Sequence, residues 1–171
     1  MIISLTGFMG CGKSSVGRKL SELLCCPFMD LDAEIEARCG CTVAEIFAER
    51  GEAEFRMLEK ETLKDILETG GIILALGGGA VMTPECERMV HEQSVCVYLR
   101  TSVDELVSRL SEESAGRPLL NTTDLRTRIL DLMSKRTSTY ERVAHLVIDT
   151  DGKTIDQVAS EILTTLLPSK R

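Results

Sequence analysis

Gly7-Phe8-Met9-Gly10-Cys11-Gly12-Lys13-Ser14 fills every fixed position of the pattern G-x-x-x-x-G-K-S/T. The run from Ile2 to Thr6 before it is apolar and β-branched and predicts a buried strand, and apolar residues recur at helical spacing after it. A glycine loop between a strand and a helix binds phosphate, because backbone N–H groups and the helix N-terminus face the anion. A chance glycine turn is the alternative, and the flanks on both sides disfavour it.

The loop predicts specific nucleotide contacts. Lys13 is expected to reach the β- and γ-phosphates and to act in catalysis, and the hydroxyl of Ser14 is expected to bind Mg²⁺. Within and just after the loop, the ATP contacts that we predict are Gly10, Cys11, Gly12, Lys13, Ser14 and Ser15.

Length and charge limit the class of protein. At 171 residues with 43% hydrophobic residues, the chain fits a single domain, 1–171, with one aliphatic core. A net charge of −7 argues against a general nucleic-acid surface. No apolar run approaches the roughly 20 residues of a membrane span, and the first residues lack a basic, apolar leader. We expect a cytoplasmic monomer with no nucleic-acid or membrane partner.

Seven cysteines raise the question of disulfides or zinc. The count is odd, and Cys25-Cys26 and Cys39-x-Cys41 lack the paired C-x-x-C spacing of zinc ribbons. Neither His91 nor His145 lies near a cysteine pair in sequence. We predict reduced, mostly buried thiols.

Strand-like and helical runs alternate along the whole chain, which predicts a parallel sheet covered on both faces. The fold class is therefore α/β, with three α/β/α layers and five parallel strands. In such sheets, ligands gather at the carboxyl ends of the strands. The predicted strands are residues 2–6, 27–30, 72–76, 95–99 and 146–148.

Two carboxylates, Asp30 and Asp32, follow the second strand. If the extended backbone continues, both side chains point the same way. One carboxylate near Mg²⁺ and one near a substrate hydroxyl would suit phosphoryl transfer. The alternative is that Asp32 is a helix N-cap.

Gly77-Gly78-Gly79 ends the most apolar strand and forms either a plain turn or a place where a ligand approaches the backbone closely. The stretch from Ser111 to Thr123 has no apolar periodicity and predicts a long functional or disordered loop around Arg117-Pro118. By pattern alone, Arg56 and Arg136 are solvated surface residues.

Taken together, these motifs resemble the shikimate kinases over essentially the full chain. The resemblance implies a P-loop NTPase fold of the nucleoside-monophosphate-kinase type that moves the γ-phosphoryl group of ATP to the 3-hydroxyl of shikimate. The P-loop is common to many enzymes, and the remaining motifs are more specific. They are Asp30-x-Asp32, Gly51-Glu52-x-x-Phe55-Arg56, Gly77-Gly78-Gly79, Arg117-Pro118-Leu119-Leu120 and Arg136-x-x-x-Tyr140.

The resemblance also implies how the domain is divided. The P-loop is residues 7–14, a substrate-binding helical segment spans 32–70, and a mobile lid spans 111–123. Asp32 would contact the shikimate hydroxyls and act in catalysis, and Arg56 and Arg136 would bind the shikimate carboxylate. The remaining substrate contacts would be Gly77, Gly78 and Gly79.

On the nucleotide side, the resemblance implies that Arg117 comes from the lid to the phosphates as a third catalytic residue. Asp30 would support, through water, the Mg²⁺ bound by Ser14. Arg109 and Lys153, the latter in the loop Asp151-Gly152-Lys153, would lie near the adenine.

Two other functions fit the P-loop. A gluconate-type or nucleoside monophosphate kinase shares the fold, but a nucleotide acceptor needs a base pocket and no carboxylate clamp. A nucleotide-dependent switch with a protein partner would hydrolyse ATP slowly without shikimate.

Overall fold

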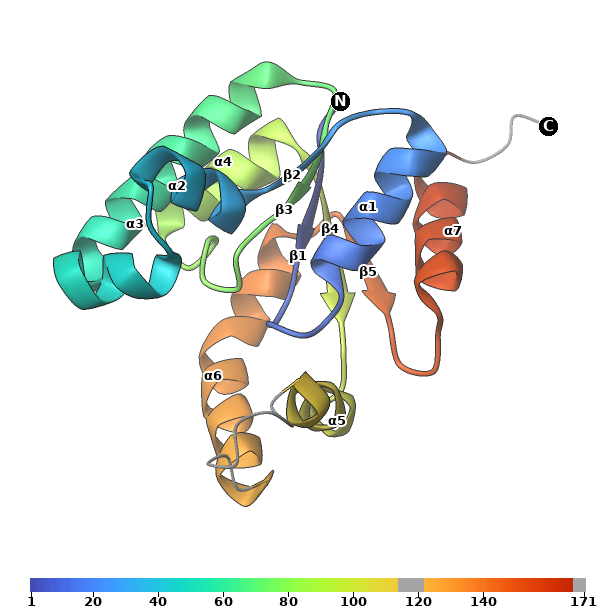
Figure 1. Cartoon of the computed structure of the whole chain (residues 1–171). Helices are drawn as coiled ribbons and strands as arrows, with labels where there is room; N and C mark the ends of the chain where they lie inside the picture. Colours follow the sequence, from blue (N-terminus) through green and yellow to red (C-terminus); the bar gives the residue numbers. More distant parts are fainter. Residues whose placement is uncertain (114–121, 168–171) are drawn as a thin grey trace.

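The structure is a computed structural model, and it describes residues 1–113 and 122–167, without the side chains of residues 122 and 123 (Figure 1). These residues contain five strands and seven labelled helices, and at least one helix follows each strand. The strands are β1 (Ile3–Thr6), β2 (Phe28–Asp30), β3 (Ile73–Ala75), β4 (Val95–Arg100) and β5 (Leu146–Asp149). The helices are α1 (Lys13–Leu24), α2 (Leu31–Cys39), α3 (Val43–Thr69), α4 (Pro84–Gln93), α5 (Val103–Glu113), α6 (Thr122–Val143) and α7 (Ile155–Leu166).

The sheet has the order β2-β3-β1-β4-β5, and every pair is parallel, as the sequence predicts. β1 lies in the centre, where Ile3 is in register with Ile73 on one side and Val95 on the other. The carboxyl ends of all five strands therefore lie at the same end of the sheet, which is the lower end in Figure 1. The P-loop and α5 also lie there.

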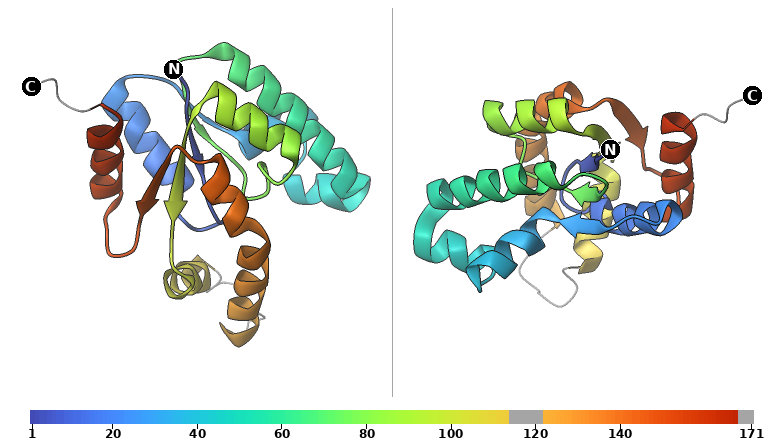
Figure 2. Two further views of the ribbon diagram at one scale, coloured as in Figure 1. Left: turned by 180° about the vertical axis from the view of Figure 1, so that it is seen from behind. Right: turned by 90° about the horizontal axis from the view of Figure 1, so that it is seen from above.

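Alternating strand residues build two cores. Ile3, Leu5 and Val97 belong to a cluster that includes residues of α1 and α7, whereas Leu74 and Tyr98 belong to one with α3, α4 and the end of α6. Figure 2 shows α1 and α7 together on one side of the sheet and α3 and α4 on the other. The sheet is thus the middle of three layers, which confirms the predicted fold class.

Local sequence signals set several helix boundaries. The capping boxes at Thr42 and Thr154 both form, and each satisfies backbone N–H groups at a helix start. Gly51 has φ 83° and kinks α3, so helical segments 43–50 and 52–69 follow one another, as the glycine predicts.

Three expectations need correction. The backbone leaves the extended conformation after Asp30, because β2 runs directly into α2, so Asp32 lies in the first turn of a helix. The N-cap of α2 is Asp30 rather than Asp32: its Oδ1 accepts from the backbone N–H groups of Asp32 and Ala33. The stretch 111–123 is also not irregular at its two ends, because α5 extends to Glu113 and α6 starts at Thr122, and the residues between them lie outside the described ones.

All seven cysteines are free. Only Cys11, Cys86 and Cys96 are buried, so the prediction that most of the thiols are buried is wrong. Cys25, which is exposed, ends α1 in the left-handed conformation. None of the helices in the described ranges is long and apolar enough to cross a membrane.

Candidate active site

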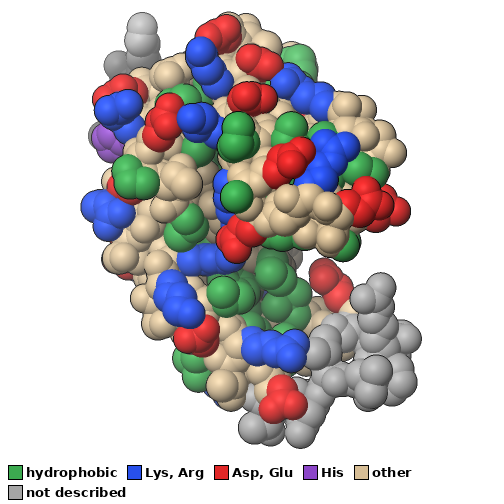
Figure 3. All heavy atoms as spheres, turned by 90° about the vertical axis from the view of Figure 1, so that its left-hand side faces the viewer, with side chains coloured by type: hydrophobic (Ala, Val, Ile, Leu, Met, Phe, Trp, Pro, Cys, Tyr) green, Lys and Arg blue, Asp and Glu red, His purple; other side chains and the backbone are tan. Residues whose placement is uncertain are grey.

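A cleft of about 800 Å³ opens at the carboxyl ends of the strands. Its walls come from the P-loop, the start of α2, the end of β3, and α5 and α7. Most of the predicted nucleotide contacts line it: Gly10, Cys11, Gly12, Lys13, Ser14, Ser15, Arg109 and Lys153. Both aspartates, Asp30 and Asp32, and the predicted substrate contact Gly77 line it as well. In Figure 3 the surface on the α3 side is hollowed between the upper and lower parts of the molecule, with basic and acidic side chains along the rim.

The P-loop needs its glycines. Gly7, Gly10 and Gly12 all have positive φ, and a Cβ on Gly7 would lie 2.8 Å from the backbone oxygen of Leu99. Only glycine adopts this path without strain. Lys13 Nζ donates to the carbonyl oxygens of Gly7 and Phe8 at 2.8 and 3.0 Å, so its ammonium already lies at the loop.

Ser14 and Asp30 bring two oxygens together. The Ser14 hydroxyl donates to Asp30 Oδ2 at 2.8 Å, while Oδ1 of the same carboxylate caps α2. The cap fixes the direction of the carboxylate, so a hydroxyl and a carboxylate oxygen face the phosphate-binding loop. Mg²⁺ prefers such oxygen ligands and keeps several waters, so this pair fits the ion.

Asp32 lies opposite the first residue of the glycine triplet. A Cβ on Gly77 would be 2.8 Å from Asp32 Oδ1, so the missing side chain leaves room for this carboxylate. Burial, and then the charge of Asp30, raises the pKa of Asp32 above its ordinary value, while Lys13 and Arg56 act in the opposite direction. A carboxylate with a raised pKa is a better proton acceptor.

Arg136 lies against the second glycine. A Cβ on Gly78 would be 3.2 Å from Arg136 Nη1. One helical turn later, the Tyr140 hydroxyl donates to the Gly78 carbonyl oxygen and so fixes the glycine backbone to α6. The Arg136 guanidinium also lies over the ring of Phe8, 6.0 Å from its centre.

Arg56 lies against the third glycine. A Cβ on Gly79 would be 2.5 Å from Arg56 Nη2. Arg56 Nη1 donates to Glu59 Oε1 at 2.7 Å, and the side chain of Glu59 is only 3% exposed. Burial raises the pKa of Glu59, and the hydrogen bond from Arg56 opposes this rise. Glu59 therefore holds Arg56 in place one turn further along α3.

Sequence reasoning missed Glu59 and Phe8. Glu59 had a signal, because a carboxylate three residues after Arg56 lies on the same face of a helix. Phe8 occupies a variable position of the P-loop pattern and had no signal. Both become visible only when α3, α6 and the P-loop are brought together in space.

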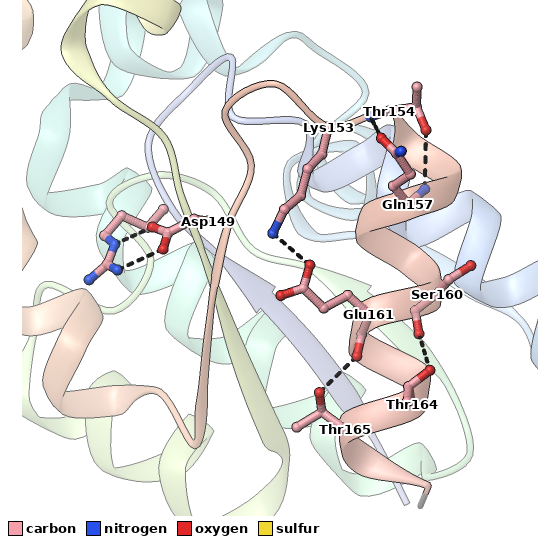
Figure 4. Close-up of polar contacts among 9 residues, drawn as sticks. Asp149, Lys153, Thr154, Gln157, Ser160, Glu161, Thr164 and Thr165 are labelled. Carbon is pink, nitrogen blue, oxygen red and sulfur yellow. Dashed lines mark hydrogen bonds and ion pairs between the residues drawn. The ribbon is translucent and has the colours of Figure 1, made fainter.

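The adenine side is less complete. Arg109 donates to the Gly10 carbonyl oxygen at 3.2 Å and to Glu105 Oε1 at 3.0 Å, so it spans α5 and the P-loop. Lys153 lines the cleft, but its Nζ donates to Glu161 Oε2 at 2.6 Å and points toward α7 (Figure 4). Arg117, with most of the predicted lid, lies outside the described residues.

Known proteins are similar to this chain over nearly its full length. A sequence model of the shikimate kinase family matches residues 9–167. The chain is 47% identical over 164 residues to a shikimate kinase from Bordetella avium, covering 96% of this chain and 78% of that protein. It is 37% identical over 164 residues to one from Thermus thermophilus, with 96% and 89% covered. The structure of the shikimate kinase from Acinetobacter baumannii in complex with shikimate matches with a TM-score of 0.89 at 36% identity, covering 99% of this chain and 94% of that one.

Proposed function

The chain belongs to the shikimate kinase family, and from this premise we propose that it transfers the γ-phosphoryl group of ATP to the 3-hydroxyl of shikimate. The observation that carries the proposal is the glycine triplet. Each of Gly77, Gly78 and Gly79 lies against a different functional side chain, in the order Asp32, Arg136 and Arg56. One carboxylate and two guanidinium groups thus meet at the end of β3, next to the phosphate-binding loop.

The two arginines suit the acceptor's carboxylate. A guanidinium donates two parallel hydrogen bonds to a carboxylate, and partly buried arginines do so with little loss of freedom. Arg56 is held by Glu59, and Arg136 lies over Phe8. This arrangement suits an acceptor that carries a carboxylate.

Asp32 is the group that we propose for the acceptor's hydroxyl. It lines the cleft together with Lys13, so an acceptor bound by Arg56 and Arg136 places its ring between the clamp and the phosphates. In this position Asp32 orients the hydroxyl and accepts its proton as the new O–P bond forms and the bond to the leaving ADP oxygen breaks.

The P-loop binds and orients the nucleotide. Residues Gly10 to Ser15 line the cleft, and we propose that backbone N–H groups at the N-terminus of α1 bind the phosphates. We propose that Lys13 exchanges the carbonyl oxygens of Gly7 and Phe8 for phosphate oxygens, which requires only rotation of its side chain. Mg²⁺ would bind to Ser14 and, through water, to Asp30, and it would neutralise charge on the transferring phosphate.

The remaining roles stay predictions. We propose Arg109 and Lys153 as neighbours of the adenine, which requires Lys153 to share its ammonium with Glu161 or leave it. The cytoplasmic location, the monomeric state and the role of Arg117 also stay predictions.

An ADP-release assay with and without shikimate tests the function. We expect turnover with shikimate and a much lower rate without it, and ³¹P and ¹H NMR of the product should place the phosphate on O3. Gluconate and nucleoside monophosphates serve as alternative acceptors. Faster turnover with either, or an ATPase rate that ignores shikimate, would contradict the proposal.

A further inference from the structure

A second, smaller hollow of about 400 Å³ lies behind the nucleotide cleft. We call it the rear groove and define it by Tyr98, Val103, Met133, Thr137, Asp149 and Asp151. It lies between the ends of β4 and β5, the start of α5 and the middle of α6. None of the residues assigned above to catalysis or to shikimate lines it.

The rear groove is lined mainly by apolar side chains. Val103 and Met133 supply apolar surface along its sides. Tyr98, which is 2% exposed and packs against Tyr140, closes the groove at the bottom and offers almost no surface of its own. An apolar ligand group would therefore be buried between Val103 and Met133.

The charges at the groove favour a cation. Arg100 also lines it, but both its Nε and Nη2 donate to the carboxylate of Asp149, at 2.6 and 2.9 Å. The charges of Arg100 and Asp149 therefore cancel each other. Asp151 is exposed, and among the described residues its carboxylate accepts one hydrogen bond, from the backbone N–H of Ser102 to Oδ1 at 3.0 Å. The unbalanced charge of the groove is therefore negative and lies on Asp151.

The rear groove and the nucleotide cleft share a wall. Asp149 and Asp151 line the groove, whereas Thr150 between them lines the cleft. Thr101 lines the groove, and its hydroxyl lies 2.6 Å from the Thr150 hydroxyl in a buried hydrogen bond. The two sites are therefore connected through one buried hydrogen bond.

We propose that the rear groove binds a small arylalkylammonium compound, with its ring between Val103 and Met133 and its ammonium at Asp151, and that this binding is coupled to nucleotide binding. The ring buries apolar surface, and the ammonium meets the unpaired carboxylate. Coupling follows because Thr150 and Thr101 form one hydrogen-bonded wall between the two sites. Thermodynamics requires that each ligand change the affinity of the other by the same factor.

The test uses three probes of similar shape and different charge: 2-phenylethylamine, 2-phenylethanol and 3-phenylpropanoate. Each is titrated into ¹⁵N-labelled full-length protein while amide shifts are followed by NMR. We expect saturable shifts at Val103, Thr137 and Asp149 with the amine, and about tenfold weaker binding of the carboxylate, which corresponds to about 1.4 kcal/mol. Repeating the amine titration with a saturating ATP analogue should change its affinity, and the amine should change that of the analogue by the same factor.

Two variants refine the test. Thr137→Met fills the groove from α6 and should abolish the amine shifts, and Asp151→Asn should remove the preference of amine over alcohol. The wild-type titration decides the matter even if a variant folds poorly. Shifts confined to the P-loop, shifts that do not saturate, equal binding of amine and carboxylate, or an amine affinity that ignores nucleotide would each overturn the proposal.

Discussion

The guanidinium of Arg56 occupies the space that a side chain on Gly79 would take, since a Cβ there would lie 2.5 Å from Nη2. Gly79 does not have positive φ, so its backbone conformation alone would accept alanine. The glycine is needed for the approach of Arg56. This relationship joins the end of β3 to α3 and leads to a test that separates binding from folding.

Gly79→Ala should impair shikimate binding and leave the fold intact. The added methyl displaces the end of a flexible side chain, so the melting temperature should change little. A displaced guanidinium should raise the KM for shikimate by roughly tenfold or more, because a shift of about 1 Å at a positioning residue has effects of this order. Steady-state kinetics and thermal unfolding measure both.

Gly7→Ala is the matched control. There the new Cβ would lie 2.8 Å from a backbone oxygen of Leu99, and φ is +145°, so the loop itself must move. This variant should lose stability and ATP binding together. A Gly79→Ala enzyme with an unchanged KM for shikimate would show that Arg56 does not bind the acceptor.

The glycine triplet also shows how far the sequence could go. Apolar and β-branched runs predict the five parallel strands correctly, and the pattern is strongest in β1, β3 and β4, which are buried on both faces. The edge strands β2 and β5 are only partly buried. The pattern of three glycines indicates a close approach, but not which side chain approaches each glycine. Arg56 and Arg136 are far apart in sequence, and nothing local distinguishes them from solvated arginines. Their roles followed only from the family resemblance.

Asp30 and Asp32 illustrate a different limit. The sequence placed both at the end of β2, and both do line the cleft. The sequence offered Asp32 as the alternative N-cap, and this was wrong because Asp30 is equally suited to cap a helix and lies at its start. The helix begins at Leu31, directly after β2, so the carboxylate of Asp30 caps it. Asp32 lies in the first turn and lines the cleft.

Asp32→Asn should retain ATP binding and the fold while kcat falls by about 10²-fold or more, because both orientation and proton acceptance are lost. In the wild-type enzyme, the acid limb of kcat/KM should lie above 3.8, the ordinary pKa of an aspartate, since burial raises the pKa of Asp32. Stopped assays across pH and nucleotide titration measure these quantities. Near-normal turnover of the variant would remove Asp32 from the reaction.

Arg56→Ala should weaken shikimate binding by about 2–5 kcal/mol, the usual cost of leaving one member of a desolvated charge pair unpaired. It should also destabilise the protein, because Glu59 then stays buried without its partner. The double variant Arg56→Ala/Glu59→Gln should recover stability but not shikimate binding. Equal losses of ATP affinity and shikimate affinity would instead place Arg56 at the phosphates.

His145 makes stability depend on pH. His91 and His145 stack with ring centres 4.4 Å apart, and His145 Nδ1 accepts the backbone N–H of Cys96 at 3.1 Å. Burial, and then His91, lowers the pKa of His145 from 6.5. The unfolded chain therefore takes up this proton at higher pH than the folded one, and the free energy of unfolding decreases as pH falls below 6.5.

Urea unfolding between pH 7.5 and 5 measures this effect. The midpoint should fall with pH in the wild type and fall less in His145→Gln, whose side chain does not titrate. His91→Gln keeps the hydrogen bond of His145 and should have an intermediate slope. Glu87, whose own pKa is lowered by Arg142, is the nearby carboxylate that also acts on His91, so Glu87 must be kept in both variants. Identical slopes in all three proteins would exclude His145 as the source.

Asp30→Asn tests the metal site, because it changes charge while keeping the cap. Asparagine caps a helix about as well as aspartate, so Asp32 and Ala33 should keep an acceptor and the variant should fold. The neutral amide is a weaker partner for the waters of Mg²⁺, so the free Mg²⁺ needed for half-maximal turnover should rise. Binding of Mn²⁺ with an ATP analogue, followed by electron paramagnetic resonance, should weaken in parallel. Asp30→Ala removes both functions and should add about 1 kcal/mol of destabilisation from the lost cap. If Asp30→Asn needs no more metal than the wild type, Asp30 serves only as the helix cap, and the hydrogen bond from Ser14 has no part in binding the ion.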